Sequence, residues 1–333
     1  MNPSTARPRE VAPAGPGPGP GPAPARAWHA VGHAENFPVA SILVPRRLRG
    51  AVVAIYRFAR HADDIADEGD ADVATRDLTL HALDDALRVA QAGRASGTPV
   101  VDALRAPMQA HSLGWVHLHH LLDAFRQDLR VTRYPDPASV QAYCDRSANP
   151  VGRLMLELFG AATPDNVARA DAICSALQRI NFLQDVTIDR DKGRVYLPLA
   201  TLARAGVDPA SLDAALAGPG LAPPVREAIR IEAARARAQM LAGADLVGRV
   251  PVRLGLELRF IIAGGLRILE RIARQDHDVS RARPVLGWRD APALLRLALR
   301  PRAGAARTVG AVGDAAEVAD PKAEASIAWR ARR

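Results

Sequence analysis

The sequence predicts an all-α protein. Alanine, leucine and arginine dominate its 333 residues, and aromatic residues make up only 4%. These residues favour helices, and the strand-forming residue types are sparse. Apolar residues recur at helical spacing through the middle of the chain, where we find no convincing strand alternation. Since 48% of the residues are apolar, we expect a substantial hydrophobic core.

Ten helices are expected in the order of the chain, and proline or glycine residues separate most of them. The expected helices span residues 46–68, 72–92, 100–111, 116–132, 137–145, 150–162, 164–190, 223–247, 252–274 and 291–300. Before them, residues 1–27 are rich in proline, glycine and alanine, and we expect them to be disordered. Residues 301–333 have no sustained apolar face and are also expected to be disordered. One domain over residues 28–300 remains.

The net charge of +8 comes almost entirely from arginine, because Lys192 and Lys322 are the only lysines. The arginines are spread along the chain, so we expect no nucleic-acid partner. Cys144 and Cys174 lack metal-site spacing, and no secretory signal precedes them, which favours a reducing cytoplasm. The longest apolar stretch, 260–266, is too short to cross a bilayer. We therefore expect a cytoplasmic protein that meets a lipid substrate at the inner membrane surface.

A first polar stripe lies in the expected helix 46–68. It consists of Tyr56, Arg60, Asp63 and Asp67, at the spacing i, i+4, i+7 and i+11. This spacing places the four side chains on one helix face. Apolar residues surround the stripe, so we expect it to point inward. The alternative interpretation is a solvated acidic helix end.

A second stripe lies near the end of the expected helix 164–190. Gln178, Asn181, Asp185 and Asp189 share one face there. The alternative here is a surface helix with ordinary pairs of aspartate with arginine or lysine. Stacked carboxylates in apolar surroundings repel each other unless a cation compensates. Two such stripes therefore predict a divalent cation held between two helices.

Oxygen ligands from aspartate and asparagine suit Mg²⁺ or Mn²⁺ and argue against zinc. The Glu-x-x-His pairs of a di-iron bundle are absent from the sequence, as are nucleotide-hydrolysis motifs. Mg²⁺ held by a few carboxylates keeps positions that phosphate oxygens fill, and Arg60 and Arg194 could complete a diphosphate clamp. The pattern indicates metal-assisted departure of diphosphate from an apolar substrate, which leaves a carbocation.

Four ordered segments carry a family resemblance: NFPVASILVP, AIYRFARHADDIAD, YCDRSANPVGRLML and QRINFLQDVTIDRDKGRVYLP. Together they resemble the squalene/phytoene synthase family over roughly residues 30–290. The details are most similar to its hydroxysqualene synthase branch in bacterial hopanoid biosynthesis. The resemblance implies an isoprenoid synthase-type helical bundle around a central cavity.

The resemblance also implies a role for each matching position. Asp63, Asp67, Asp185 and Asp189 match the two aspartate-rich motifs that bind Mg²⁺ and, through it, diphosphate. Tyr143 matches a tyrosine near the departing diphosphate. The remaining matches are a diphosphate-contacting Arg60, an Asn181 that joins the metal shell, a Gln178 on the same face, and a helix kink beside the prenyl cavity at Val151 and Gly152.

Two departures from the family pattern bear on the reaction. Many members carry arginine where this chain has Gln184, and a serine-rich stretch where it reads Glu35-Asn36-Phe37-Pro38. Both favour a relative that receives a preformed diphosphate. We expect Mg²⁺-dependent conversion of presqualene diphosphate to hydroxysqualene, without NADPH, and a functional association with neighbouring enzymes of the squalene pathway.

Two alternatives stay open. One is condensation of two prenyl diphosphates to presqualene diphosphate, squalene or phytoene, and the other is a non-catalytic helical protein that binds prenyl lipids.

The other polar clusters of the sequence are interpreted as structural. We expect His111, His117, His119 and His120 to be surface or core residues, and Asp123 and Asp128 to cap or pair locally. The segment 260–266 is interpreted equally well as cavity lining and as ordinary core.

Overall fold

The computed structural model describes residues 43–217, 220–287 and 290–299. The two segments predicted to be disordered, 1–27 and 301–333, lie outside these ranges, and so do residues 36–42 of the NFPVASILVP segment. Within the described residues every regular element is a helix, apart from one isolated parallel bridge between Arg133 and Val195. The predicted fold class is therefore confirmed.

Thirteen α-helices and two short 3₁₀ helices make up the described part of the chain. In order they are α1 Arg46–Asp67, α2 Val73–Gln91, α3 Pro99–Ala110, α4 Val116–Asp128, α5 Pro137–Ser147, α6 Asn149–Leu158, α7 Pro164–Gln184, α8 Val186–Asp191, α9 Leu199–Arg204, η1 Pro209–Ser211, α10 Leu212–Leu216, α11 Pro223–Gly243, η2 Ala244–Gly248, α12 Val252–Arg274 and α13 Ala291–Leu299.

Side-chain caps explain why several helices begin where the sequence predicts. The Asp72 carboxylate accepts a hydrogen bond from the Thr75 amide at 2.8 Å, at the start of α2. Asp136 and Ser139 form a reciprocal capping box at the start of α5. Thr163 caps α7, whose first residue is Pro164. Such caps satisfy amide groups that have no partner within the helix.

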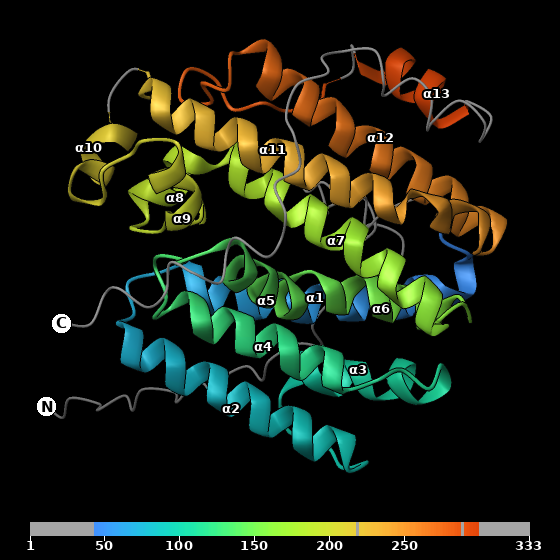
Figure 1. Cartoon of the computed structure of the whole chain (residues 1–333). Coiled ribbons are helices and arrows are strands. Elements are labelled where there is room, and N and C mark those ends of the chain that lie inside the picture. Colours follow the sequence, from blue (N-terminus) through green and yellow to red (C-terminus); the bar gives the residue numbers. More distant parts are fainter. Residues whose placement is uncertain (1–42, 218–219, 288–289, 300–333) are drawn as a thin grey trace, which may run out of the picture.

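Helix α7 crosses the middle of the molecule (Figure 1). It packs against α11 and α12 on one side and against α5 and α6 on the other. Helices α1 to α4 form a second group, in which α1 contacts α2, α3 and α4. This arrangement puts the helix with the second stripe between the two halves of the protein.

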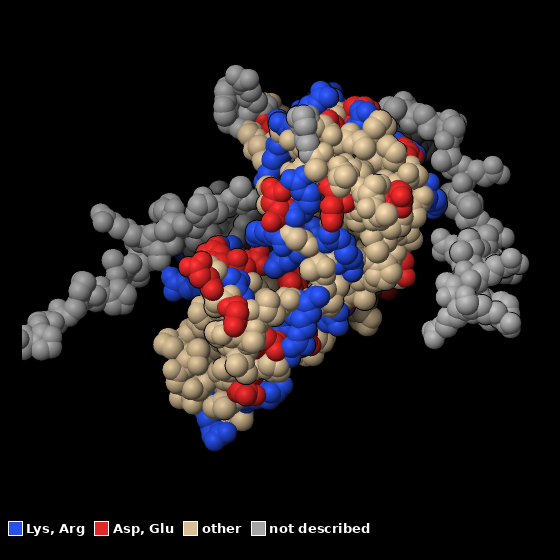
Figure 2. Space-filling model, turned by 90° about the vertical axis from the view of Figure 1, so that its left-hand side faces the viewer, with Lys and Arg blue, Asp and Glu red and all other residues tan. Residues whose placement is uncertain are grey.

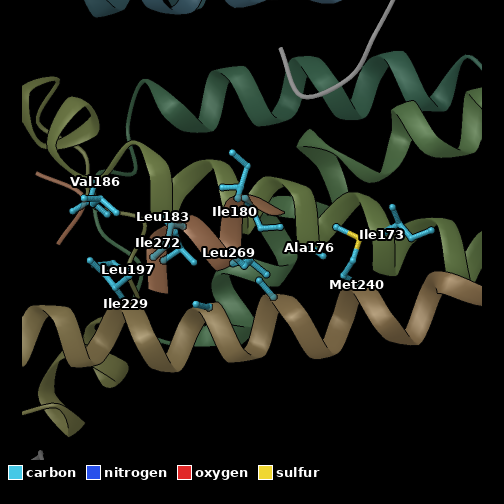
Figure 3. Packing of buried hydrophobic residues seen from close by; sticks show 14 of the residues in the cluster. Ile173, Ala176, Ile180, Leu183, Val186, Leu197, Ile229, Met240, Leu269 and Ile272 are labelled. Atoms are coloured by element: carbon cyan, nitrogen blue, oxygen red, sulfur yellow. The ribbon is translucent and has the colours of Figure 1, made fainter. Parts of the chain in front are cut away.

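The core has one large cluster in each half. In the first, Ile173, Ile180 and Leu183 of α7 meet Ile229 and Met240 of α11 (Figure 3). The second cluster joins the apolar faces of α1 to α4 with the end of α6. Burial of these faces accounts for most of the stabilisation that helices of this kind receive in water.

The expected helix 164–190 is interrupted at Asp185, which separates α7 from α8. The backbone of Asp185 has φ −107° and ψ 15°, which is not helical. The side-chain amide of the preceding residue, Gln184, donates to the Pro284 carbonyl of a distant segment. The backbone amide of Asp189 still bonds to the Asp185 carbonyl at 2.7 Å. The break is therefore local, and the two aspartates remain one turn apart.

The sequence did not predict α9, η1 and α10. These helices have six, three and five residues, which is too short for a periodic apolar pattern to be recognised. Three expected helices also end four residues earlier than predicted: 116–132, 150–162 and 223–247 correspond to Val116–Asp128, Asn149–Leu158 and Pro223–Gly243. Errors of this kind are usual at helix ends.

Segment 260–266 lies within α12, whose 23 residues are mostly buried on one face. The flanking Arg267 forms ion pairs with Glu270 and Asp290. In the part of the chain that the structure describes, no helix combines the length and the apolar character needed to cross a bilayer.

Candidate active site

The first aspartate motif lies at the C-terminal end of α1. Its stripe was expected to be buried, but Arg60 and Asp63 are 44% and 41% exposed, and Asp67 is 20% exposed. The expectation was wrong in this respect because the motif lies at a helix end, next to the loop that leads to α2. Arg60 pairs with residues of its own helix and cap: Asp63 at 3.0 Å, and Asp64 and Glu68 at 2.7 Å.

The second motif extends from the end of α7 into α8. Gln178, Asn181 and Asp185 are partly buried on α7 and at its cap, and Asp189 is partly buried on α8. Arg283, from the segment after α12, binds both oxygens of Asp185, with Nε–Oδ1 at 2.5 Å and Nη2–Oδ2 at 3.0 Å. Nothing in the sequence pattern indicated Arg283, because it follows Asp185 by 98 residues.

The two motifs are connected by the loop that follows α8. Gly193 has φ +79°, and the turn it forms carries the amide of Arg194 back to the Asp189 carbonyl at 2.8 Å. The side chains of Lys192 and Arg194 then reach Asp67, each at 2.7 Å. A turn at the end of one motif thus delivers two cations to the other motif.

The side of the molecule on which α8 to α10 lie shows acidic and basic side chains next to one another (Figure 2). The carboxyls within the motifs differ in their electrostatics. Burial and the charge of Asp67 raise the pKa of Asp63 to about 6, and burial and the charge of Asp185 raise the pKa of Asp189 to about 7. Burial acts on Asp67 in the same direction, but hydrogen bonds from Arg194 and Lys192 outweigh it and lower its pKa.

These carboxyls fit a divalent cation by their chemistry. Asp63 and Asp189 are oxygen donors whose ionised forms are disfavoured by burial and by a neighbouring aspartate, and a metal ion would relieve that cost. Within the described residues, no group of three or more His, Cys, Asp or Glu side chains is arranged to hold a metal by itself. Mg²⁺ does not need such a group, because one or two carboxylates and substrate phosphates commonly hold it.

A cluster of tyrosines surrounds a buried aspartate beneath the motifs. The hydroxyls of Tyr143 and Tyr196 donate to the two oxygens of Asp128, at 2.6 and 2.9 Å. Tyr134 packs against both rings, and Phe182 stacks on Tyr196 with centroids 3.9 Å apart. Burial raises the pKa of Asp128 to about 6, although hydrogen bonds from the tyrosines and the charge of Arg194 oppose the shift.

The expected local role of Asp128 is therefore wrong. Its partners, Tyr143 and Tyr196, lie 15 and 68 residues away along the chain, so this role is not one of local capping or pairing. A signal for Tyr196 was present, since it lies in the GRVYLP part of the second motif segment. Because Arg194 acts on the pKa of Asp128 and binds Asp67, the tyrosine cluster is electrostatically linked to the first motif.

An apolar pocket lies between α6, α7, η2 and α12. Its walls are formed by Gly152, Met155, Leu156, Ala170, Ile173, Cys174, Leu177, Leu246, Leu254, Leu258 and Ile261. Gly152 is thus part of a cavity wall, and a side chain there would come within 2.6 Å of the Cys174 sulfur. Of the segment 260–266, Ile261 faces this pocket, while Ile262 and Ala263 are core residues.

Two of the four histidines, His117 and His119, have structural partners. His117 Nε2 lies 2.9 Å from Glu157 Oε1, joining α4 to α6, and His119 pairs with Asp84 of α2. Their contacts go to different helices, in agreement with the expected structural role.

Comparison with known proteins identifies the family. The family model described as squalene/phytoene synthase matches residues 30–290. The chain is 36% identical to the hydroxysqualene synthase of Rhodopseudomonas palustris over 244 residues, which cover 73% of this chain and 80% of the relative. It is 30% identical to the presqualene diphosphate synthase of the same organism over 265 residues, covering 78% and 91%.

Among solved structures, the squalene synthase HpnC from Alicyclobacillus acidocaldarius is similar, with 37% sequence identity and a TM-score of 0.67. The match covers 74% of this chain and 90% of that chain. The fold, the ordered motifs and these relatives agree with one another. The chain belongs to the squalene/phytoene synthase family, whose enzymes act on prenyl diphosphates.

Proposed function

We propose that this protein catalyses the Mg²⁺-dependent conversion of presqualene diphosphate to hydroxysqualene and diphosphate. The observation that carries the proposal is the bridge between the aspartate motifs, in which Lys192 and Arg194 of the second motif segment bind Asp67 of the first. The bridge gathers carboxylates and cations at one place in a helical protein with a large apolar core. Such a combination suits a substrate with a diphosphate head group and a hydrocarbon body.

In this mechanism, Asp63, Asp67, Asn181, Asp185 and Asp189 would hold Mg²⁺. When bound, Mg²⁺ neutralises the charge that develops on the departing diphosphate.

The arginines act on the same leaving group. Arg194 and Arg283 are paired with Asp67 and Asp185, so both guanidinium groups lie beside the proposed ligands. Planar guanidinium groups bind phosphate oxygens with two hydrogen bonds, and they keep their charge throughout. We propose that they contact the diphosphate as it leaves. Gln178 shares a helix face with Asn181 and would contact the substrate there.

Tyr143 is held in place by Asp128, which accepts its hydroxyl hydrogen bond at 2.6 Å. This contact orients the tyrosine beneath the motifs before substrate binds. The apolar side chains that line the pocket beside α6 and α7 would form part of the surface that meets the hydrocarbon chains. Both features support ionisation in a protected cavity.

A second candidate is condensation of farnesyl diphosphate to presqualene diphosphate, which the similarity to a presqualene diphosphate synthase favours. The residue before Asp185 supports our first choice. Gln184 is buried, and its amide donates to the Pro284 carbonyl, so it serves as a tie between segments. The arginine that many relatives carry at this position would add a charge that this chain lacks.

The test is an assay of purified protein with Mg²⁺ and either presqualene diphosphate or farnesyl diphosphate. We expect hydroxysqualene from presqualene diphosphate, without added NADPH, and no product from farnesyl diphosphate alone. A C30 or C40 product from farnesyl diphosphate alone would instead establish the condensation reaction. Failure to consume either substrate would favour a prenyl-lipid-binding protein.

A substrate with long hydrocarbon chains is drawn from a membrane, so we propose that the protein works in the cytoplasm at the inner membrane face, next to other enzymes of the squalene pathway. A flotation assay with anionic vesicles measures the membrane contact directly.

A further inference from the structure

The turn from η2 into α12 exposes a short apolar tip. We call residues 248–253, with the sequence GRVPVR, the α12 tip. Val252 is 86% exposed, more than any other large hydrophobic residue in the described part of the chain. Pro251 is also exposed, and Val250 is partly exposed. Apolar residues that stay exposed together on a folded protein often mark contact with a membrane or with another protein.

The backbone around the α12 tip is tightly packed. A side chain at Gly255, near the start of α12, would come within 2.5 Å of the Val247 carbonyl of η2, so only glycine permits this close approach. The side chain of Arg169 on α7 binds Asp245 of η2 at 2.8 Å. The exposure of Val252 therefore belongs to a turn that is fixed against the rest of the protein.

Two arginines flank the apolar residues of the tip. Arg249 is 45% exposed and pairs with Asp245 at 3.1 Å. Arg253 is exposed and forms no ion pair within the described residues, and the first turn of α12 contains no acidic residue. Arginine places its aliphatic stem along an apolar surface and keeps its guanidinium group at the polar boundary. The tip thus combines an apolar centre with a basic rim.

The α12 tip is continuous with one wall of the apolar pocket. Leu246 lies just before the tip and Leu254 directly after it, and both side chains line that pocket. The charged motifs lie elsewhere: the junction of α11 and α12 is at the end of the molecule opposite α8, which carries Asp189 (Figure 1). A surface bound at the tip would therefore meet the apolar end of the candidate site and leave the charged end in water.

We propose that the α12 tip inserts Val252 into the interface of an anionic membrane. This inference rests on the proposed function, and it names the surface that makes the membrane contact. Apolar burial together with attraction between basic side chains and anionic lipids drives such binding. The net charge of +8 acts in the same direction.

Charge favours a membrane over a second copy of this chain. In a two-fold symmetric contact the same patch of both copies meets, so Arg249 and Arg253 of one copy would face the same arginines of the other. Such like charges repel, whereas phosphate groups of anionic lipids would neutralise them.

The experiment measures flotation of the full chain with vesicles of phosphatidylcholine and phosphatidylglycerol. Val252→Asp should lower the bound-to-free ratio about tenfold, because it replaces the inserted apolar group by a charge. Arg253→Gln should lower it about fivefold, the effect of one basic residue at an anionic surface. Val252→Leu should retain binding. Melting temperatures should not fall in any of these variants, because both side chains are exposed.

Leu78→Asp and Arg94→Gln are the matched controls. Leu78 is 69% exposed on α2, and Arg94 is exposed in the turn after α2. Helix α2 lies on the side of the molecule away from α12 (Figure 1). Both control variants should float as the wild type does, and the wild type should float less with vesicles of phosphatidylcholine alone.

Three outcomes would overturn the inference. They are absence of wild-type flotation, unchanged flotation of Val252→Asp, and equal flotation of the wild type with neutral vesicles. Self-association that Val252→Asp abolishes, without flotation of the wild type, would assign the tip to a second copy instead. Turnover of presqualene diphosphate in detergent tests the proposed function separately: Val252→Asp should match the wild type there, and a wild type that floats but has no turnover would overturn the proposed function alone.

Discussion

The two aspartate motifs are alike in electrostatics and different in backbone. The first lies at the end of one continuous helix, α1, whereas the second extends across the break between α7 and α8. In each motif, one aspartate is bound by cations from a distant part of the chain: Asp67 by Lys192 and Arg194, and Asp185 by Arg283. The other aspartate, Asp63 or Asp189, has a raised pKa.

This comparison shows that neither motif is complete within its own helix. The first motif depends on a turn that follows the second, and the second depends on the segment after α12. Such dependence makes one end of the helical protein a single charged site.

The largest expected effect comes from removing one proposed ligand in each motif. Asp63→Asn and Asp185→Asn should each lower turnover of presqualene diphosphate by about a thousandfold, because each removes charge from the site of diphosphate departure. Asp171→Asn is the control, since Asp171 is a partly buried aspartate paired with Arg153 away from the motifs. Turnover rates and melting temperatures check all three variants. Full turnover in the Asp63 and Asp185 variants would favour the non-catalytic binding protein.

The second-largest effect is expected from replacing Arg194 or Arg283, the two arginines that bind the motif aspartates. Arg194→Gln should lower turnover about a hundredfold and Arg283→Gln about tenfold, because Arg194 is the more buried and joins both motifs. Side-chain exposures of 14% and 35% support this order. Steady-state kinetics at saturating Mg²⁺ measure the difference. Equal losses would mean that the bridge between the motifs has no special importance.

The third prediction uses opposite pKa shifts in metal-free protein. Folding raises the pKa of Asp189 from 3.8 to about 7, so the free energy of unfolding falls as pH rises through this range. Folding lowers the pKa of Asp67, so its contribution is present above its unfolded pKa and is lost as pH falls. In EDTA at pH 8, Asp189→Asn should therefore stabilise the protein and Asp67→Asn should destabilise it, each by roughly 1 kcal/mol after screening.

Thermal unfolding from pH 4 to pH 8 checks these slopes. Stability of the wild type and of the Asp67 variant should fall with the contribution of Asp189, while the Asp189 variant should keep only the smaller fall that the raised pKa values of Asp63 and Asp128 cause. Destabilisation of the protein by Asp189→Asn at pH 8 would contradict the assigned raised pKa.

The smallest effect on the charged site is expected from a substitution in the wall of the apolar pocket. Gly152→Ala brings a methyl group within 2.6 Å of the Cys174 sulfur, so it should cost about 1–3 kcal/mol of stability. The double variant with Cys174→Ala should recover part of this loss, because the two positions are in contact. Affinity for inorganic diphosphate should stay close to that of the wild type. A large loss of that affinity would mean that the pocket and the motifs are not separable.

The sequence predicts the parts of this protein that are local. Helix periodicity gives the fold class and locates α1, α7 and α12, and capping residues such as Asp72, Asp136 and Thr163 define helix starts. Both aspartate motifs are visible because four residues along a helix make one turn.

Contacts between residues far apart in the chain could not be predicted from the sequence pattern. Asp128 and Arg283 act through partners 68 and 98 residues away, which no periodicity encodes. The break at Asp185 was also missed, because the apolar pattern continues through it. The ion pairs of Arg60 within its own helix were not foreseen, since the family resemblance directed attention to diphosphate.

The central claim is that the two motifs form one diphosphate site. Calorimetric titration of inorganic diphosphate in the presence of Mg²⁺ tests it with Asp63→Asn, Asp185→Asn and the double variant. For one shared site, each single change should remove most of the binding free energy, and the double change should remove little more. Losses that add as for two independent sites would contradict the account.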